Sequence, residues 1–123
     1  MATELSAKLV WTFMAPTNVP EDVDNLLAPG EKAVAAFKTV RDVAIFTDKR
    51  LIVKDVQGIT GKKVEIYSLP YARINMWSTE NAGIVDLNSE VELWTMTGHI
   101  KIKLGRGIDI RQFDRLLSSA ILI

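Results

Sequence analysis

The sequence predicts an α+β domain in which about seven antiparallel strands form a strongly bent sheet, or a partly open barrel, capped by a C-terminal helix. Three observations predict this fold class. Apolar and polar residues alternate between residues 31 and 104, turns rich in Pro and Gly divide this region at regular spacing, and residues 108–122 change to the period of an amphipathic helix. The 123 residues, 48% hydrophobic and 24% charged, suffice for one soluble globular domain over residues 1–123.

The first 30 residues are expected to form a short helical segment. Leu5, Leu9 and Phe13 recur at four-residue spacing, which predicts an amphipathic helix that ends before Pro16. A second short helix is expected to begin near residue 20 and to stop before Pro29, because acidic residues occupy its first turn and apolar residues share one face. These two helices would precede the sheet.

Seven segments have the alternating pattern of β-strands. They are residues 31–40, 42–47, 50–56, 62–68, 72–79, 90–97 and 99–104, and a short apolar piece lies at 84–87. The last strand is the clearest, because Ile100, Ile102 and Leu104 share one face while His99 and two lysines share the other. His99 is therefore expected to be an exposed side chain on the outer face.

The C-terminal segment has the signals of a well-defined helix. Asp109 is the expected N-cap, and Gln112 follows three residues later, as in a capping box. Ile108 and Phe113 flank the cap at the spacing of a hydrophobic staple. The apolar stripe comprises Ile110, Phe113, Leu116, Leu117, Ala120 and Ile121. A stripe of this length needs a large partner surface, so the helix is expected to be integral to the fold.

The composition excludes several classes of function. The chain has no cysteine and a single histidine, His99, which excludes disulfides, thiolate nucleophiles and multi-histidine metal sites. Little remains for acid–base catalysis, so we expect neither enzyme activity nor a cofactor. A net charge of zero argues against a nucleic-acid partner. No apolar run approaches the ~18–20 residues that span a bilayer, and no basic leader precedes an apolar stretch, so a cytoplasmic protein is expected.

The charges are arranged in blocks along the chain. The formal balance is −3 over residues 1–30, +4 over 31–78, −4 over 79–98 and +3 over 99–123. Such blocks can bring the acidic surface of one copy against the basic surface of another. A solvated surface of mixed charge is the alternative interpretation.

Several motifs resemble those of a known family. The stretch from Arg41 to Ile52 has the pattern R-D-x-x-x-F-T-x-K-R-L-I, and Q-G-I-T-G-K-K, S-x-P-Y and D-L-x-S-E follow at 57–63, 68–71 and 86–90. Over about residues 25–123 the chain resembles the bacterial pleckstrin-homology-like (PH-like) family of small uncharacterised proteins. The resemblance implies seven strands with a capping helix, no enzymatic activity, and a homo-oligomeric ring, pentameric for single-domain members. It also implies a polar surface that binds a protein partner.

Charged residues near these motifs are the candidates for the polar surface: Arg41, Asp48, Lys49, Arg50, Lys62 and Lys63. Hydrated turns with weak local ion pairs are the alternative. A second functional hypothesis is a peripheral membrane module that binds anionic lipid headgroups through these cations and Lys38. Phosphoinositide-binding PH domains carry a K-x(n)-[KR]-x-R pattern across their first two strands. Residues 38–42 contain only two basic residues, so most of that pattern is missing here.

Three aromatic residues are candidates for contacts between copies of the chain. Trp77, Trp94 and Tyr67 alternate with polar neighbours on their strands, and large aromatics on polar faces are typical of subunit contacts. The alternative is that curvature buries both faces of the sheet and that the N-terminal helices cover the outer one. The sequence therefore favours a non-catalytic ring-forming scaffold, with membrane binding as the alternative.

Overall fold

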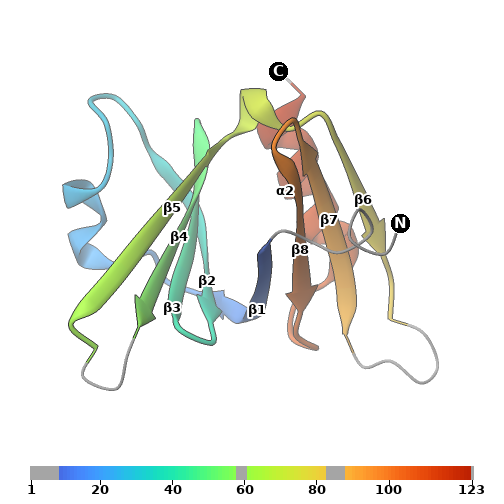
Figure 1. Ribbon diagram of the computed structural model, residues 1–123, viewed down its shortest axis with the longest axis horizontal. Helices are drawn as coiled ribbons and strands as arrows, with labels where there is room; N and C mark the ends of the chain where they lie inside the picture. The colour runs from blue at the N-terminus through green and yellow to red at the C-terminus, as the bar shows by residue number, and fades with distance from the viewer. Residues whose placement is uncertain (1–8, 58–60, 83–87, 123) are drawn as a thin grey trace.

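A computed structural model describes residues 9–57, 61–82 and 88–122, and it contains a single curled sheet of eight strands (Figure 1). The strands are β1 (Leu9–Thr17), β2 (Ala33–Thr39), β3 (Asp42–Thr47), β4 (Arg50–Gln57), β5 (Lys63–Pro70), β6 (Met76–Glu80), β7 (Ser89–Thr95) and β8 (Gly98–Leu104). The helices are the 3-10 turns η1 (Glu21–Asn25) and η2 (Tyr71–Arg73) and the α-helix α2 (Ile110–Ile121).

The strand order is β5-β4-β3-β2-β1-β8-β7-β6, so the first strand lies in the middle of the sheet. It pairs antiparallel with β2 and parallel with β8, whereas all other neighbours are antiparallel. Figure 1 shows that β2–β5 form one wall, β6–β8 form the other, and β1 joins them at the base. This confirms the PH-like α+β fold with seven predicted strands. The eighth strand is β1, and the apolar piece at 84–87 lies outside the described residues.

The helix predicted up to Pro16 is wrong, because the described part of this segment forms strand β1. The four-residue spacing that suggested a helix depends on Leu5, which lies outside the described residues, and on Leu9 and Phe13. Phe13 is fully buried at the centre of the domain, and strands pair with both edges of β1. Tertiary pairing therefore overrides the apparent helical period. The second predicted helix is confirmed in short form as η1.

Each face of the sheet has its own apolar cluster. On the inner face, Phe13, Phe37, Phe46 and Phe113 pack with ring centroids 5.4–6.4 Å apart. On the outer face, side chains of β2–β4 form a smaller cluster under Val23 of η1. Strands β3 and β4 are thus covered on both faces, which explains their nearly continuous apolar runs.

Helix α2 begins as the sequence predicts. The carboxylate of Asp109 accepts hydrogen bonds from the backbone N–H groups of Arg111 (2.9 Å) and Gln112 (3.2 Å). Ile108 and Phe113 both join the inner cluster, as expected of the staple. The turn before the helix requires Gly105, since a Cβ there would lie 2.3 Å from the Met14 carbonyl oxygen. This close approach ties the start of the helix segment to β1.

We expect the substitution Phe113→Ala to reduce the free energy of unfolding by about 3–5 kcal/mol, because it removes a buried ring from the aromatic cluster. Phe113 is 2% exposed, whereas Leu122, just after the helix, is 68% exposed and serves as the matched control. Urea denaturation of both alanine variants measures the difference. A loss below about 1 kcal/mol for Phe113→Ala would mean that the helix contributes little to the core.

Candidate functional site

A buried ion pair occupies the region where the sequence places part of its polar surface. Arg50 donates from Nε to Glu31 Oε2 (3.0 Å) and from Nη2 to Glu31 Oε1 (3.1 Å) and to the Leu26 carbonyl (2.6 Å). The Thr47 hydroxyl donates to Glu31 Oε2 at 2.6 Å, and the backbone N–H of Ala28 donates to Oε1 at 2.8 Å. Four donor groups from three residues thus converge on the carboxylate of Glu31. We call this arrangement the Glu31 clamp.

The electrostatics of the clamp favour the ionised carboxylate. Burial alone would raise the pKa of Glu31, but the hydrogen bonds from Arg50, Thr47 and Ala28, together with the charge of Arg50, outweigh it and lower this pKa to about 2. Tyr71 continues the network by donating its hydroxyl to the Thr47 carbonyl at 2.6 Å, and burial raises the pKa of that phenol. The clamp is therefore a fixed structural element.

The polar candidates divide into two groups that lie at opposite ends of the strands β3 and β4. Asp48, Lys49 and Arg50 lie at the β3–β4 turn, whereas Arg41 lies at the β2–β3 turn and Lys62 and Lys63 lie at the start of β5. The six residues of β3 separate the two ends by about 20 Å.

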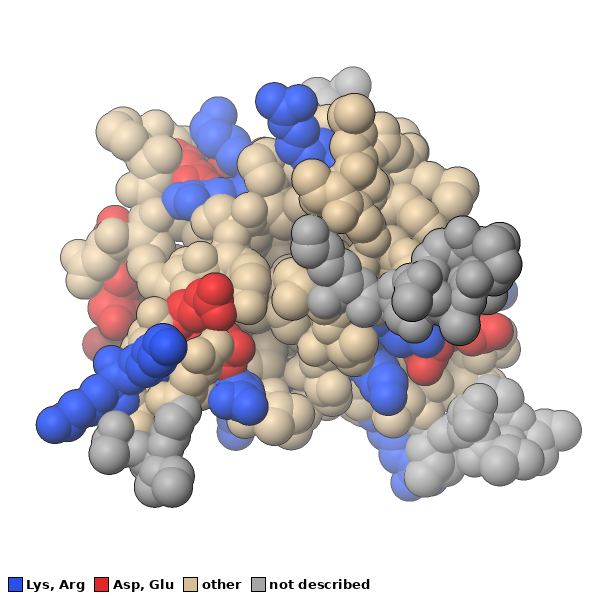
Figure 2. Space-filling view, in the orientation of Figure 1, with Lys and Arg blue, Asp and Glu red and all other residues tan. Residues whose placement is uncertain are grey.

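Three of these charges are already engaged in the fold: Arg50 is held by Glu31, the Asp48 carboxylate accepts the Lys32 N–H at 3.0 Å, and Arg41 Nε lies 3.5 Å from Asp55 Oδ1. Lys49, Lys62 and Lys63 are exposed. Figure 2 shows acidic and basic side chains intermixed on this face of the molecule. The six candidates therefore do not form a single cationic surface.

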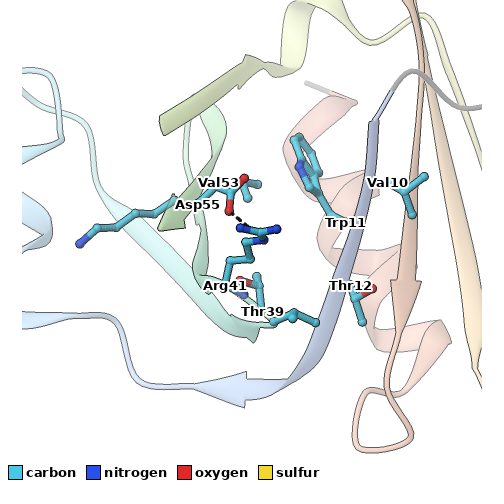
Figure 3. Close-up of a pocket in the computed structure, with 9 residues that line it drawn as sticks. Val10, Trp11, Thr12, Thr39, Arg41, Val53 and Asp55 are labelled. Carbon is cyan, nitrogen blue, oxygen red and sulfur yellow. Dashed lines mark hydrogen bonds and ion pairs between the residues drawn. The ribbon is translucent and has the colours of Figure 1, made fainter. Parts of the chain in front are cut away.

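An open groove lies between β1 on one side and the β2–β3 turn and β4 on the other (Figure 3). Its volume is about 250 Å³, and its lining residues are Val10, Trp11, Thr12, Thr39, Val40, Arg41, Val53, Lys54 and Asp55. Trp11 projects from β1 on one side, while the Arg41–Asp55 ion pair lies on the other. Of these residues only Arg41 is a candidate from the sequence, because the spacing of apolar residues around Trp11 predicted a helix there.

Acidic groups beside the groove are held in a hydrogen-bonded row. Asp55 and Glu65 are directly opposite on β4 and β5, and the Gln57 amide donates to both carboxylates, at 3.2 and 3.0 Å. The Tyr67 hydroxyl donates to Glu65 at 2.9 Å, and this hydrogen bond is the main cause that raises the pKa of Tyr67. Shared donors thus offset the repulsion between two facing carboxylates.

The three aromatic candidates lie in different environments. Tyr67 and Trp77 pack against the inner cluster; the Tyr67 ring centroid lies 5.7 Å from that of Trp11, and Trp77 Nε1 donates to Asp114 Oδ1 of α2 at 2.9 Å. For these two residues the structure agrees with the alternative interpretation, in which curvature brings these faces of the sheet against the core. Trp94 lies on the outer face as expected, directly opposite Met76.

His99 lies on the outer face, but the expectation that it is exposed is wrong. The residue is 8% exposed, its ring centroid lies 5.8 Å from that of Trp94, and its Nε2 lies 3.5 Å from Glu92 Oε2. Trp94 and His99 are cross-strand partners in the β7–β8 pair. A large neighbour on the adjacent strand covers a side chain that would otherwise be solvated.

The described residues contain no helix long and apolar enough to cross a membrane, and no cluster of three potential metal-ligating side chains.

A curled sheet with this strand order and one C-terminal helix is the architecture of a pleckstrin-homology domain. The family model of the bacterial PH domain matches residues 5–121. The chain therefore belongs to the bacterial PH domain family.

Known proteins with similar sequences come from Bacillus subtilis. The uncharacterized protein YjqA is 55% identical over 76 residues, which cover 62% of this chain and 61% of YjqA. The uncharacterized protein YozO is 27% identical over 96 residues, which cover 78% of this chain and 83% of YozO. The match to YjqA thus spans less than two thirds of that relative.

Solved structures share the fold. A pleckstrin-homology domain protein from Shewanella loihica has a TM-score of 0.79 at 31% identity, covering 87% of this chain and 96% of its own. A pleckstrin-homology domain from Shewanella amazonensis has a TM-score of 0.68 at 33% identity, covering 87% and 94%. These structures support the family assignment and the fold.

We expect Arg50→Met to destabilise the protein by about 3 kcal/mol or more, because it leaves the buried Glu31 carboxylate without its cation. The side chains of Arg50 and Glu31 are 25% and 1% exposed. Arg41→Met is the matched control, since the Arg41 side chain is 57% exposed and its ion pair is worth at most about 1 kcal/mol. Equal destabilisation of the two variants, measured by urea denaturation, would contradict a special role for the clamp.

The same ion pair gives the stability a defined pH dependence. The pKa of Glu31 is about 2 in the folded protein against an ordinary value of 4.5, so the folded state binds fewer protons between these values. The stabilisation from ionised Glu31 is complete above about pH 4.5 and is lost as the pH falls toward about 2. We therefore expect the difference in unfolding free energy between wild type and Arg50→Met to narrow over this interval. If the difference in unfolding free energy between the two proteins stays constant from neutral to acidic pH, ionised Glu31 is not the source of the stabilisation.

Proposed function

We propose that this protein is a non-catalytic cytoplasmic PH-like domain that assembles into a homo-oligomeric ring, pentameric as the family resemblance implies, and serves as a protein-interaction scaffold. The observation that carries the proposal is the distribution of exposed apolar side chains on the outer face of the sheet. Val64 and Ile66 on β5 are each 43% exposed, and Met76 on β6 is 53% exposed beside Trp94. We call the first pair the β5 patch and the second pair the Trp94 patch.

The positions of the two patches favour a closed ring. Strands β5 and β6 are the two ends of the sheet order, so the patches lie at opposite ends of one surface. When one patch of a protomer contacts the other patch of its neighbour, the interface is heterologous, and repeated contacts close into a ring if the rotation permits. A heterologous interface needs two different contact surfaces on each protomer, and the two apolar patches are such surfaces.

The charge blocks support the assembly less than the apolar patches do. On β7 and β8 the acidic residues face basic partners of the same chain: Glu90 Oε1 lies 3.6 Å from Lys101 Nζ, and Glu92 is directly opposite Lys101. Opposite charges that are paired within a protomer contribute little to contacts between protomers. Apolar burial is therefore the main driving force that we assign to the ring.

The groove supports the scaffold role. Its rim combines Trp11 and Arg41 with the exposed side chains of Val10 (54%) and Val40 (69%). Aromatic residues and arginine are enriched in protein interfaces, and exposed aliphatic groups next to them favour a protein partner. The titratable groups of the lining are Arg41, Lys54 and Asp55, a set without the nucleophile–base pair of covalent catalysis.

Size-exclusion chromatography with light scattering is expected to give a mass several times 13.7 kDa at micromolar concentration and moderate salt. Trp94→Ala should lower this mass while the circular dichroism spectrum stays folded, because the substitution removes a large apolar group from the patch. Val34→Ala is the control, since Val34 is 59% exposed but belongs to neither patch.

Ile66→Ser tests the complementary patch and should lower the mass in the same way. Trp77→Ala should instead reduce stability, because Trp77 binds α2 through Asp114. A monomeric wild-type protein would contradict the ring. If the wild type is oligomeric but Trp94→Ala and Ile66→Ser keep its mass, the interface lies elsewhere.

Vesicle co-sedimentation distinguishes the scaffold from the membrane alternative. Because the candidate cations are divided between the two ends of the strands, and because Arg41 and Arg50 are paired within the chain, we expect no more sedimentation with anionic vesicles than with neutral ones. Strong binding that declines as salt rises, and that Lys62→Gln together with Lys63→Gln abolishes, would favour the membrane module instead.

A further inference from the structure

A polar cleft separates the edge strand β6 from helix α2. Its volume is about 390 Å³, and it is lined by Thr79 and Asn81 from the strand side and by Ile110, Arg111, Asp114 and Arg115 from the helix. The Trp77 indole donates to Asp114 at the same boundary, so the strand runs beside the helix over this part of the chain. The cleft is distinct from the groove at β1 and contains none of the residues of the Glu31 clamp.

Two arginines of the cleft are available to bind an anion. Arg111 and Arg115 are exposed, one helical turn apart on α2, and neither forms an ion pair with any described residue. The carboxylate of Asp114 faces the cleft too, but it accepts the hydrogen bond from Trp77. The cleft therefore has an excess of positive charge, and its guanidinium groups suit a carboxylate or phosphate oxygen.

The backbone of β6 adds a second recognition element. This strand ends the sheet order, and within the described residues no strand pairs with its outer edge (Figure 1). The edge of its five residues, Met76–Glu80, presents backbone donors and acceptors that an extended peptide can pair with. A free phosphate or a lipid headgroup has no such backbone to match, so the edge strand favours a peptide.

We propose that the cleft between β6 and α2 binds an extended acidic peptide of a partner protein, which adds a strand to β6 and places carboxylates against Arg111 and Arg115. Four residues along a helix advance about 6 Å. Alternate residues of an extended strand lie on one face about 6.6 Å apart. The two spacings match, so the preferred ligand has acidic residues at alternate positions, with apolar or polar residues between them.

This inference rests on the proposed function only in that the ligand is a protein. The cleft opens on the inner face, where Trp77 and Thr79 point, whereas the Trp94 patch lies on the outer face. Assembly and peptide binding therefore use different faces and are measured separately. Glu80 is on the same face of β6 as Met76, which is the outer face, because alternate residues of a strand share a face. Its charge therefore lies away from the side on which the ligand carboxylates bind.

Fluorescence polarisation with labelled seven-residue peptides tests the proposal on the full chain. The probe has the sequence Ser-Val-Glu-Val-Glu-Val-Ser, its neutral twin carries Gln in place of both Glu residues, and a third peptide is N-methylated at alternate backbone nitrogens. We expect the acidic probe to bind at least tenfold more tightly than the neutral twin. The N-methylated peptide should bind at least tenfold more weakly than the probe, because it cannot pair with the strand edge.

Substitutions in the chain assign the binding to the cleft. Arg111→Gln combined with Arg115→Gln should weaken binding of the acidic probe at least tenfold and leave the neutral twin unaffected. Arg106→Gln is the matched control, since Arg106 is an exposed arginine outside the cleft. Circular dichroism and light scattering on the same samples verify that the double variant keeps its fold and mass.

Four results would overturn the proposal. The first is that the acidic probe does not bind the folded wild-type protein, and the second is that the N-methylated peptide binds as tightly as the probe. The third is that the wild-type protein binds anionic vesicles but no peptide, and that the double variant no longer binds the vesicles. The fourth is that no peptide binds and the double variant has a different oligomer mass, which would assign the cleft to a contact between copies. A monomer that binds the acidic probe would contradict only the ring. An oligomer that binds no peptide would contradict only the cleft.

Discussion

The position of β1 in the middle of the sheet holds the two walls of the domain together. It pairs with β2 on one edge and with β8 on the other, and thereby joins two meanders that are otherwise separate in the strand order. Its Phe13 is fully buried among rings from both β2–β3 and α2, and its backbone carbonyl accepts the Gly105 N–H at 2.8 Å. One strand thus fixes the curvature of the sheet, the position of the helix and the side on which the groove opens.

The family motif around residues 41–52 holds the fold and does not by itself mark a binding surface. Its Thr47 and Arg50 bind the buried carboxylate of Glu31, and Thr47 also accepts backbone N–H groups of the β3–β4 turn. Because four donors offset the desolvation of Glu31, a carboxylate remains ionised in the interior. The residues of a family signature can therefore be structural, and the surfaces that bind partners then lie in other parts of the sheet.

The binding surfaces that we assign share one physical origin. A half-barrel sheet leaves two edge strands, β5 and β6, and a groove where its walls separate. At the edges, apolar side chains on the outer face are exposed, and on the inner side of β6 the helix supplies arginines. The proposed assembly and the proposed peptide binding both depend on the incomplete closure of the sheet, since a closed barrel would have no free edge.

Local sequence signals were sufficient to predict the elements that depend on short-range interactions. The alternation in 99–104, the cap at Asp109, the staple and the stripe of the helix predicted β8 and α2, and seven strands were located from their turns. Residues 9–17 form a strand because of long-range pairing, which no local signal reveals, since both strand partners of β1 are distant in sequence. Tertiary packing also decides which face of each strand is inside. Curvature turns the partly buried Trp77 and Tyr67 towards the inner cluster, a cross-strand neighbour buries His99, and Glu31 meets Arg50 nineteen positions along the chain. Alternation divides the residues of a strand between two faces, but the choice of the buried face depends on how the sheet curls around its core.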